Sequence, residues 1–402
     1  MTKQNKWEYK QLSSLGSFSK GVGISKADLV PQGDPCIRYA EIYTKYNFQL
    51  SQCLSHIPTE IAQKSTPIAY GNILFAGSGE TVEDIGKSVA YLGKDTAYAS
   101  GDIIIFTLKD KKENALFFSY YLNTAGRQQL NKLGEGQSIV HIYPEELSKV
   151  FVPHPLAEEQ QKIVEVLETW DKAIQLTRKL IEQKELQKKY LMQQLLTGRT
   201  RLNGCTDCWT EEPFRKLINI YQGYPFKSSS YVKNGTYRII TIANVQQGQL
   251  DTTKCNYINE LPKNLQTYQR LQIGDLIFSM TGNVGRSCWV SRDNCLLNQR
   301  VGKIQTKKIN KQFLYHFLQN PKFIYDMIVC AQGGAQANLS VKDILKYHIY
   351  FPSDITEQES IAKILSLNDK EIDLLHQKIA KLEEQKKGLM QILLTGKVRL
   401  NW

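Results

Sequence analysis

Residues 156–198, LAEEQQKIVEVLETWDKAIQLTRKLIEQKELQKKYLMQQLLTG, predict the longest element of the chain. No proline follows Pro155 within this stretch, and Gly198 supplies a typical helix stop. At about 1.5 Å per residue, a helix of this length would span roughly 60 Å. Its apolar residues recur near heptad spacing, as expected of a helix that packs against a partner: Ile163, Leu167, Trp170, Ile174, Ile181, Leu191 and Leu195.

The same stretch has a second copy near the C-terminus. Residues 357–401 align with residues 159–203 without a gap, and about half of the aligned positions are identical. Two copies, each closing one half of the chain, indicate a tandem duplication. The segments in front of the copies share landmarks but differ strongly between them, which fits either two domains adapted to different ligands or neutral drift. The matching landmarks are Trp7 with Trp209, 37–42 with 240–245, 71–79 with 274–282, and 134–138 with 333–337.

The segments in front of the helices have the pattern of mixed globular domains. Short apolar runs predict strands at residues 37–40, 72–76 and 101–106, and a helical pattern covers residues 114–133. Strands mixed with few helices indicate an α+β class rather than a doubly wound sheet. We expect two α/β domains separated by two long helices, related by a pseudo-twofold internal repeat. The expected boundaries are 1–154 for the first domain, 155–198 for the first helix, 199–208 for a linker, 209–352 for the second domain and 353–396 for the second helix.

The two helix copies differ at their seams. The first copy places Lys184 and Lys188 in the heptad seam, and Lys184 aligns with Leu382 of the second copy. A helix with such a seam is poorly suited to pair with its own equivalent. We therefore expect the two copies to pair antiparallel with each other, in a coiled-coil-like manner. Thr356 and Glu359 have the spacing of a capping box at the start of the second helix.

Composition narrows the class of protein. The chain has 402 residues and a net charge of +12, and residues 204–354 carry about +8 of it, which suggests a polyanionic partner. It contains no 18-residue apolar run and no apolar core of a signal peptide, so we expect a cytoplasmic protein without a membrane partner. Among the cysteines only Cys205 and Cys208 have metal-ligand spacing. Without a second such pair, a linker with two reduced thiols is favoured over a zinc site.

The sequence lacks the motifs of catalysis. Residues 79–88 resemble a phosphate loop, but six residues rather than four separate Gly79 from Gly86, and the amides could not wrap a phosphate in the same way. We find no glycine fingerprint of a dinucleotide or methyl-donor site, no Asn-Pro-Pro-aromatic run, no HExxH and no nucleophile elbow. We therefore expect no catalytic residues and no metal site in this chain.

Glycine-rich hairpin tips supply candidate binding residues. Gln and Asn suit adenine, Arg suits guanine and Glu suits cytosine in the major groove, whereas Lys and Ser suit phosphates. Such hairpins are usually only turns, but their recurrence at equivalent places in both halves favours binding. The candidate DNA-binding residues are Arg38, Ser78, Glu80, Lys87, Gln137, Ser138, Lys227, Ser228, Thr281, Asn283, Arg286, Gln336 and Asn338.

With these features together, the chain resembles the specificity subunits of type I restriction-modification systems. The resemblance covers essentially the whole chain. It rests on the order domain, helix, domain, helix, on the glutamine-rich helix starts after Pro155 and Pro352, and on the repeated Leu-Met-Gln-x-Leu-Leu-Thr-Gly followed by Arg-Leu-Asn. The Gly-Asp-Leu-Ile-Phe-Ser and Phe-Lys-Ser-Ser runs also match. Asn72 and Ala76 depart from Asp275 and Ser279 of the second copy, so the first hairpin is expected to be used differently.

The resemblance implies a function without catalysis. Two target-recognition domains would each read one half of a split, asymmetric site in double-stranded DNA, and the helices would set the spacing between the halves. Two methyltransferase subunits would dock on the helices and restriction-translocase subunits would join outside. S-adenosylmethionine, ATP and magnesium would bind to those partners, with no cofactor in this chain. The candidate docking residues are Gln160, Gln161, Gln358, Lys188 and Lys386.

A second class of function stays open. The helix pair could serve as a scaffold whose two globular domains bind proteins. A DNA-binding titration with salt should show no steep slope for such a scaffold, whereas phosphate contacts must produce one. An autonomous restriction enzyme would need nuclease or methyltransferase motifs, and the sequence contains neither.

Overall fold

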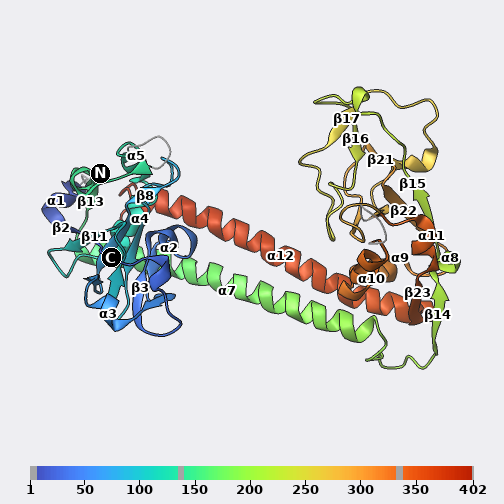
Figure 1. The fold of residues 1–402 in the computed structure, drawn as a ribbon, viewed down its shortest axis with the longest axis horizontal. Coiled ribbons are helices and arrows are strands. Elements are labelled where there is room, and N and C mark those ends of the chain that lie inside the picture. Colours follow the sequence, from blue (N-terminus) through green and yellow to red (C-terminus); the bar gives the residue numbers. More distant parts are fainter. Residues whose placement is uncertain (1–6, 135–139, 332–337, 401–402) are drawn as a thin grey trace. The chain divides into compact units, whose positions relative to one another are not determined.

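The structure is a computed structural model that describes residues 7–134, 140–331 and 338–400. The chain forms two compact units (Figure 1). Unit 1 comprises residues 1–178 and 377–402, and unit 2 comprises residues 179–376. Each unit therefore contains one globular domain together with a part of each long helix. In the described part of the chain, no helix is long and apolar enough to cross a membrane.

The domain of unit 1 contains two main sheets. The strands of the larger sheet lie in the order β2-β11-β7-β9-β4, and those of the smaller sheet in the order β5-β3-β10-β6. Neighbouring strands are antiparallel except β3 with β10 and β4 with β9. The bounds are β2 Gly16–Lys20, β3 Asp34–Ile37, β4 Gln49–Leu50, β5 Ser55–Ile57, β6 Thr66–Ile68, β7 Asn72–Ala76, β9 Ser88–Tyr91, β10 Ala97–Ala99 and β11 Ile103–Leu108.

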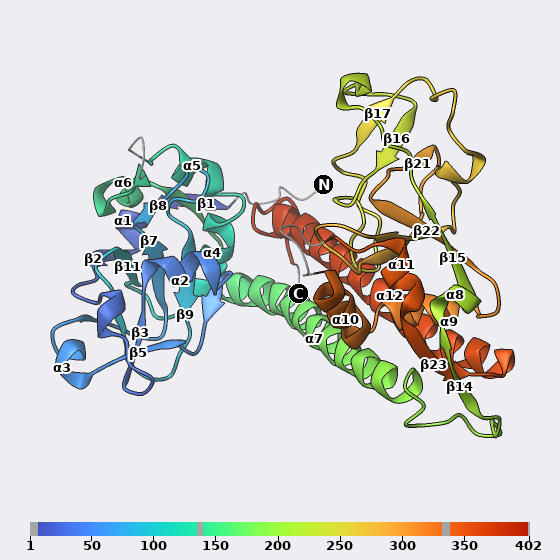
Figure 2. The same ribbon diagram turned by 45° about the vertical axis from the view of Figure 1, so that its right-hand side comes forward.

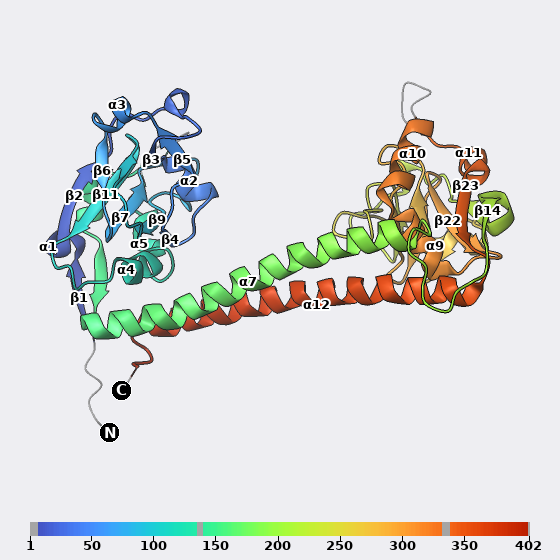
Figure 3. The same cartoon turned by 90° about the horizontal axis from the view of Figure 1, so that it is seen from below.

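The remaining elements of unit 1 connect its sheets to the long helices. Two short pairs, β1 with β13 and β8 with β12, lie outside the main sheets. Figure 3 shows α4 between the larger sheet and the start of the long helix α7 (Ala157–Leu195). The core joins these layers through Phe75, Phe106, Phe117 and Ile163, all fully buried. The bounds are β1 Glu8–Gln11, α1 Leu12–Leu15, α2 Tyr39–Thr44, α3 Thr59–Ala62, β8 Ser78–Gly79, α4 Ala115–Leu122, α5 Arg127–Asn131, β12 Val140–His141, α6 Pro144–Ser148 and β13 Phe151–His154.

The domain of unit 2 repeats this plan with fewer strands. Its sheets have the orders β15-β22-β19-β20 and β17-β16-β21-β18, and β14 pairs with β23 as β1 pairs with β13. Figure 2 shows α9 and α10 beside the long helix α12 (Ile355–Leu393), and the side chains of these three helices share one core. The bounds are β14 Trp209–Pro213, α8 Phe214–Leu217, β15 Ile218–Gln222, β16 Tyr237–Ile240, β17 Asn256–Ile258, β18 Arg270–Leu271, β19 Leu276–Ser279, β20 Ser287–Trp289, β21 Cys295–Leu297, β22 Val301–Thr306, α9 Lys311–Leu318, α10 Pro321–Ala331, α11 Val341–Lys346 and β23 His348–Pro352.

Both predicted long helices are present, as α7 (Ala157–Leu195) and α12 (Ile355–Leu393). The expected stop is also present, because Gly198 has a φ of 70° that favours glycine. The capping prediction at the second helix was wrong by two residues. The Asp354 carboxylate accepts the backbone N–H of Thr356 at 2.9 Å, so Asp354 rather than Thr356 caps α12.

Two other predicted elements differ from the structure. The strand expected at residues 37–40 ends at Ile37, and α2 begins at Tyr39. The Glu41 side chain accepts the Arg38 N–H at 2.8 Å, which closes the first turn of this helix. The helix expected at residues 114–133 is split into α4 and α5. In contrast, the strand predicted at residues 72–76 is confirmed as β7.

Within each unit the two long helices are linked by ion pairs between equivalent residues. In unit 1, Lys386 Nζ lies 2.5 Å from Asp171 Oδ1. In unit 2, Lys188 pairs with Asp369, and Lys184 Nζ lies 2.9 Å from Glu371 Oε2. The lysines that made the predicted seam unusual are therefore neutralised by carboxylates of the other helix.

A second repeated cluster ties each helix start to the domain and to the tail of the other repeat. In unit 1, the Glu159 carboxylate accepts two hydrogen bonds of 2.6 Å from Arg399 and one of 3.1 Å from Trp7 Nε1. Glu357 makes the same contacts in unit 2, with Arg201 at 2.7 Å and Trp209 Nε1 at 3.4 Å. Each arginine also lies over the tryptophan ring. The arginine of each Arg-Leu-Asn repeat thus forms a structural clasp with the glutamate and the tryptophan.

Candidate nucleic-acid interface

The hairpin after β7 in unit 1 and the hairpin after β19 in unit 2 have the same backbone frame. The Ala76 N–H donates to the Lys87 carbonyl at 2.9 Å, and the Ser279 N–H donates to the Arg286 carbonyl at 2.8 Å. These bonds make Lys87 the structural equivalent of Arg286. The unit 1 hairpin has four more residues between these anchors, and it contains the exposed Glu80. The two hairpins therefore present different groups from one frame.

The two equivalent cations are held differently. Lys87 is half-buried, and its ammonium donates to the carbonyls of Tyr43 at 3.2 Å and Tyr46 at 2.8 Å. Burial lowers the pKa of Lys87. Arg286 instead donates to the side-chain oxygen of Gln246 at 2.5 Å, which leaves further guanidinium donors for a ligand. Lys87 thus holds its own loop together, whereas Arg286 retains donors that could reach a base.

The other predicted binding residues fall into four groups. Lys227, Ser228, Asn283 and Glu80 are exposed, as a binding role requires. Arg38 is only partly exposed. It directly precedes α2, and its N–H donates a hydrogen bond to the Glu41 side chain. Ser78, Thr281 and Asn338 lie in a strand pairing described below. Gln137, Ser138 and Gln336 lie outside the described residues.

Two predicted docking residues are buried within the chain. Gln160 has no exposed surface, and its side chain accepts the Asn114 N–H at 2.9 Å and donates to the Pro155 carbonyl at 3.1 Å. Gln358 repeats this arrangement with the Asn310 N–H and the Pro352 carbonyl, both at 2.8 Å. These glutamines fasten each helix start to its own domain. Their burial does not fit the prediction that they dock another subunit.

The remaining docking candidates differ in exposure. Gln161 is exposed, but its side chain accepts a hydrogen bond of 2.8 Å from Asn114 Nδ2. Lys188 is partly exposed and pairs with Asp369. Lys386 is 5% exposed, and burial lowers its pKa although Asp171 acts in the opposite direction. A lysine so enclosed does not fit a docking role, so this prediction for Lys386 also needs correction.

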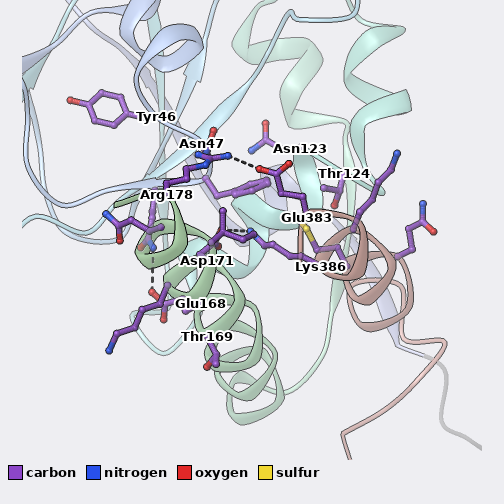
Figure 4. A pocket seen from close by; sticks show the side chains of 18 of the residues that line it. Tyr46, Asn47, Asn123, Thr124, Glu168, Thr169, Asp171, Arg178, Glu383 and Lys386 are labelled. Atoms are coloured by element: carbon purple, nitrogen blue, oxygen red, sulfur yellow. Dashed lines mark hydrogen bonds and ion pairs between the residues drawn. The ribbon is translucent and has the colours of Figure 1, made fainter. Parts of the chain in front are cut away.

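Lys386 lies beside a groove of about 1210 Å³ in unit 1 (Figure 4). The groove lies between the loops around Asn47 and Asn123 and the helices α7 and α12. Across it, Arg178 Nη2 lies 2.5 Å from Glu383 Oε1, and the Lys386 ammonium sits over the Phe48 ring at 4.4 Å. Lys386 and Arg178 are paired with carboxylates across the two helices, whereas the lining residues Lys45, Lys172 and Lys387 form no ion pair within the described part of the chain.

Tyr120 on α4 of unit 1 and His316 on α9 of unit 2 occupy equivalent positions. The Tyr120 hydroxyl donates to Asp171 Oδ2 at 2.5 Å. His316 is fully buried, its Nδ1 lies 3.8 Å from Asp369 Oδ2, and its Nε2 lies 2.9 Å from Ser366 Oγ. Burial, together with the nearby Lys188, lowers the pKa of His316 to about 4. His316 is therefore a neutral packing residue rather than a catalytic one.

The cysteines and carboxylates are also candidate ligands of a metal site. Cys205 is partly exposed and Cys208 is exposed. Within the described ranges, no group of three or more His, Cys, Asp or Glu side chains could hold a metal ion.

Sequence reasoning missed three residues of the hairpin region. Gln246 contacts Arg286, Arg300 contacts Asn338 and His141 contacts Ser78. His141 is 63 residues from Ser78 in the chain, and only the pairing of β12 with β8 brings the two side chains together. The equivalence between residues 134–138 and 333–337 pointed to this region, because Asn338 follows the second stretch directly and His141 lies three residues after the first.

Comparison with known proteins agrees with the duplicated architecture. Residues 4–186 and residues 209–384 each match the family described as the type I restriction modification DNA specificity domain. These two matches cover most of the chain, so it belongs to this family. It has the two-domain composition of a type I restriction-modification specificity subunit.

Individual relatives support this assignment. The chain is 25% identical to the type I restriction enzyme MjaVIII specificity subunit of Methanocaldococcus jannaschii, over 96% of this chain and 92% of that protein. It is 28% identical to the type I restriction enzyme EcoBI specificity subunit of Escherichia coli, over 52% of this chain and 42% of that protein.

Solved structures share the fold. The S subunit of a type I restriction-modification system from M. genitalium aligns with a TM-score of 0.60 at 16% identity, over 98% of both chains. A chain from a study of complex assembly and conformational transition of the type I R-M system aligns with a TM-score of 0.62 at 14% identity, over 98% of this chain and 99% of that one.

Proposed function

We propose that this chain is the non-catalytic subunit that directs a type I methyltransferase and restriction complex to a bipartite, asymmetric site in double-stranded DNA. One observation carries the proposal: the two family domains keep one backbone frame at their hairpins but present different side chains on it. Lys87 and Arg286 occupy equivalent positions and have different partners. Two domains with the same backbone frame but different contact residues would recognise two different half-sites.

The long helices would set the distance between the half-sites. Pairs between equivalent residues support an antiparallel arrangement, because residues early in one helix pair with residues late in the other. We propose that α7 and α12 form an antiparallel, coiled-coil-like spacer between the two target-recognition domains. The catalytic centres, with S-adenosylmethionine, ATP and magnesium, would belong to cytoplasmic partner subunits.

Exposed leucines on the long helices offer the docking surface for two methyltransferase subunits. Leu367 is 57% exposed and Leu374, seven residues later, is 54% exposed. Leu176 and Leu186 of α7 are 55% and 67% exposed. Large apolar side chains on otherwise polar helices favour burial against another subunit. We expect Leu367→Glu with Leu374→Glu to weaken copurification of the methyltransferase.

The decisive test of this function is a methylome. The chain would be produced with its methyltransferase subunit in a host without other adenine methylation, and methylated adenines would be mapped across the genome. We expect one split motif with a fixed gap, and loss of methylation without this chain. Methylation at an unsplit motif, or methylation that does not require this chain, would contradict the proposal.

A salt titration separates this function from the scaffold alternative. The purified complex would be titrated with duplex DNA at 50 to 200 mM salt, and the logarithm of affinity plotted against that of salt concentration. Phosphate contacts release counterions, so about six contacts should lower the affinity by roughly a thousandfold or more over this range. A flat plot would favour the scaffold.

A further inference from the structure

Each hairpin is bridged to a distant segment at the same position. In unit 1, Ser78 lies opposite His141 in the antiparallel pair β8 with β12. In unit 2, Thr281 lies opposite Asn338 in an isolated antiparallel bridge. Both bridges also join the two side chains, with Ser78 Oγ 3.1 Å from His141 Nδ1 and Thr281 Oγ1 2.9 Å from Asn338 Oδ1. A hydroxyl on the hairpin therefore orients the facing side chain in both units.

In unit 2 this arrangement fixes the orientation of the Asn338 amide. Arg300 Nη1 lies 3.3 Å from Asn338 Oδ1. A guanidinium can only donate hydrogen bonds, so the amide oxygen must face Arg300 and cannot exchange places with the nitrogen. Thr281 donates to the same oxygen. The Asn338 Nδ2 group makes no hydrogen bond within the described part of the chain, and Asn338 is exposed.

In unit 1 the same position carries an imidazole. His141 is partly exposed, and its ring lies 6.4 Å from that of Tyr143 with only 27° between the ring planes. Nδ1 is engaged by Ser78, and among the described residues Nε2 makes no hydrogen bond. The ring therefore presents one nitrogen, which donates or accepts according to the tautomer of the imidazole.

We propose that the bridge residues His141 and Asn338 read bases at equivalent positions of units 1 and 2, held in place by Ser78 in one unit and by Thr281 and Arg300 in the other. The inference rests on the proposed function and names the specificity determinants within it. An amide locked with its donor outward selects a base edge that accepts, namely guanine O6 or N7, adenine N7 or thymine O4. Arg300 is a positioning residue that determines which face of the amide is presented.

The alternatives in the same hairpins fit this role less well. Lys87 uses its ammonium on two carbonyls of its own domain. The equivalent of Arg286 in unit 1 is this Lys87, whose ammonium is not free to contact DNA. A base-reading position common to both units therefore cannot be the position of Arg286. The bridge position is the place where both units pair a hydroxyl with a second polar side chain that retains an unused hydrogen-bonding atom.

The test exchanges the chemistry of Asn338 in the intact complex with its methyltransferase. Asn338→Asp replaces the outward donor by a carboxylate that only accepts, and it keeps a favourable partner in Arg300. We expect methylation of the wild-type motif to fall about tenfold or more. One base pair of one half-site should change to one that presents a donor, cytosine N4 or adenine N6, while the other half-site stays unchanged. Sites would be measured on a library with randomised half-sites.

Two further variants make the result specific. Arg300→Gln removes the lock, because a glutamine can donate to or accept from the amide. We expect relaxed discrimination at the same base pair rather than a new preference. Asn219→Asp is the control for the added negative charge. Asn219 lies on β15 opposite Gln305 of β22, and Gln305 is four residues from Val301, the residue of β22 that pairs with the end of β19. The control therefore places the same charge in the sheet of β19 but away from the bridge. This control should leave the motif unchanged.

The outcomes separate the inference from the function on which it rests. If wild type methylates a split motif but Asn338→Asp leaves both half-sites unchanged, the assignment of Asn338 is wrong and the function stands. An equal loss at all sequences, with no change of preferred base, would instead make Asn338 a phosphate contact. If wild type shows no split motif, the proposed function itself fails.

Discussion

Lengthening both long helices should lengthen the gap between the half-sites. The unit boundaries fall between Arg178 and Lys179 and between His376 and Gln377, which are equivalent positions in the two repeats. Duplicating residues 172–178 and 370–376 together adds one heptad to each helix at these boundaries. Neither domain loses a contact to its own helix segments, and the two inserted heptads can pair with each other.

The expected change follows from helix geometry. Seven residues add about 10.5 Å at ~1.5 Å per residue, which corresponds to about three base pairs at ~3.4 Å each. Three base pairs also turn the second half-site by about 100°, because B-DNA has roughly 10.5 pairs per turn. A heptad turns the helix pair by only about −20°. We therefore expect a gap about three base pairs longer, with a reduced methylation rate because the domains face the wrong side of the duplex.

Adding three heptads to each helix should recover the rate. Twenty-one residues add about 31.5 Å, or about nine base pairs, and nine base pairs turn the half-site by about 310°, equivalent to −50°. Three heptads turn the helix pair by about −60°, so distance and direction then agree. Methylome sequencing of both variants gives the gap, and methylation time courses on matched duplexes give the rate. An unchanged gap in both variants would refute the spacer role, and altered half-sites would show that the domains themselves had been disturbed.

Three further predictions test other parts of the structure. Lys386→Met should destabilise unit 1 by about 2 kcal/mol, because Lys386 is buried and paired with Asp171. Lys188→Met removes a more exposed ion pair with Asp369 and should cost under about 1 kcal/mol. Urea unfolding compares the two variants, and equal losses of stability would contradict this account. Arg286→Ala should relax one half-site only, and a uniform loss across sequences in the methylome would make Arg286 a phosphate contact. Burial lowers the pKa of His316 in the folded state to about 4 from its ordinary value of 6.5, so the imidazole of the unfolded chain is protonated first as the pH falls. The free energy of unfolding should therefore decrease between pH 6.5 and 4, by about 3 kcal/mol in full. His316→Gln should abolish this contribution in urea titrations at pH 7 and pH 4.5, and an unchanged pH dependence in this variant would contradict the account.

The sequence predicted the long helices well because their signals are local. Pro155, the heptad pattern and the stop at Gly198 all lie within the element that they describe. The cap at Asp354 was missed because Thr356 begins a motif of equal appearance two residues later. The turn at Arg38 was read as a strand because the bond from its N–H to Glu41 outweighs the β-propensity of the residues around it.

The binding residues were harder to predict because they depend on contacts between distant segments. Gln160 looked like a surface residue, yet it is buried to satisfy the Asn114 N–H and the Pro155 carbonyl. Lys87 looked like a phosphate ligand, yet two carbonyls of its own domain occupy its ammonium. Arg300 gave no signal at all, because its importance comes from the amide beside it.

The clasp of Glu159 with Arg399 has a consequence for the order of folding during synthesis. Unit 2 is one continuous segment, residues 179–376, and can fold as soon as it has left the ribosome. Unit 1 needs residues 377–402, so its domain must wait for roughly 200 more residues, about 10 to 40 s at ~5–20 residues per second. During that interval the surface that later receives Met390, Leu393 and Leu394 is uncovered. A nascent chain stalled before residue 377 should therefore bind chaperones through its N-terminal domain, although that domain was made first.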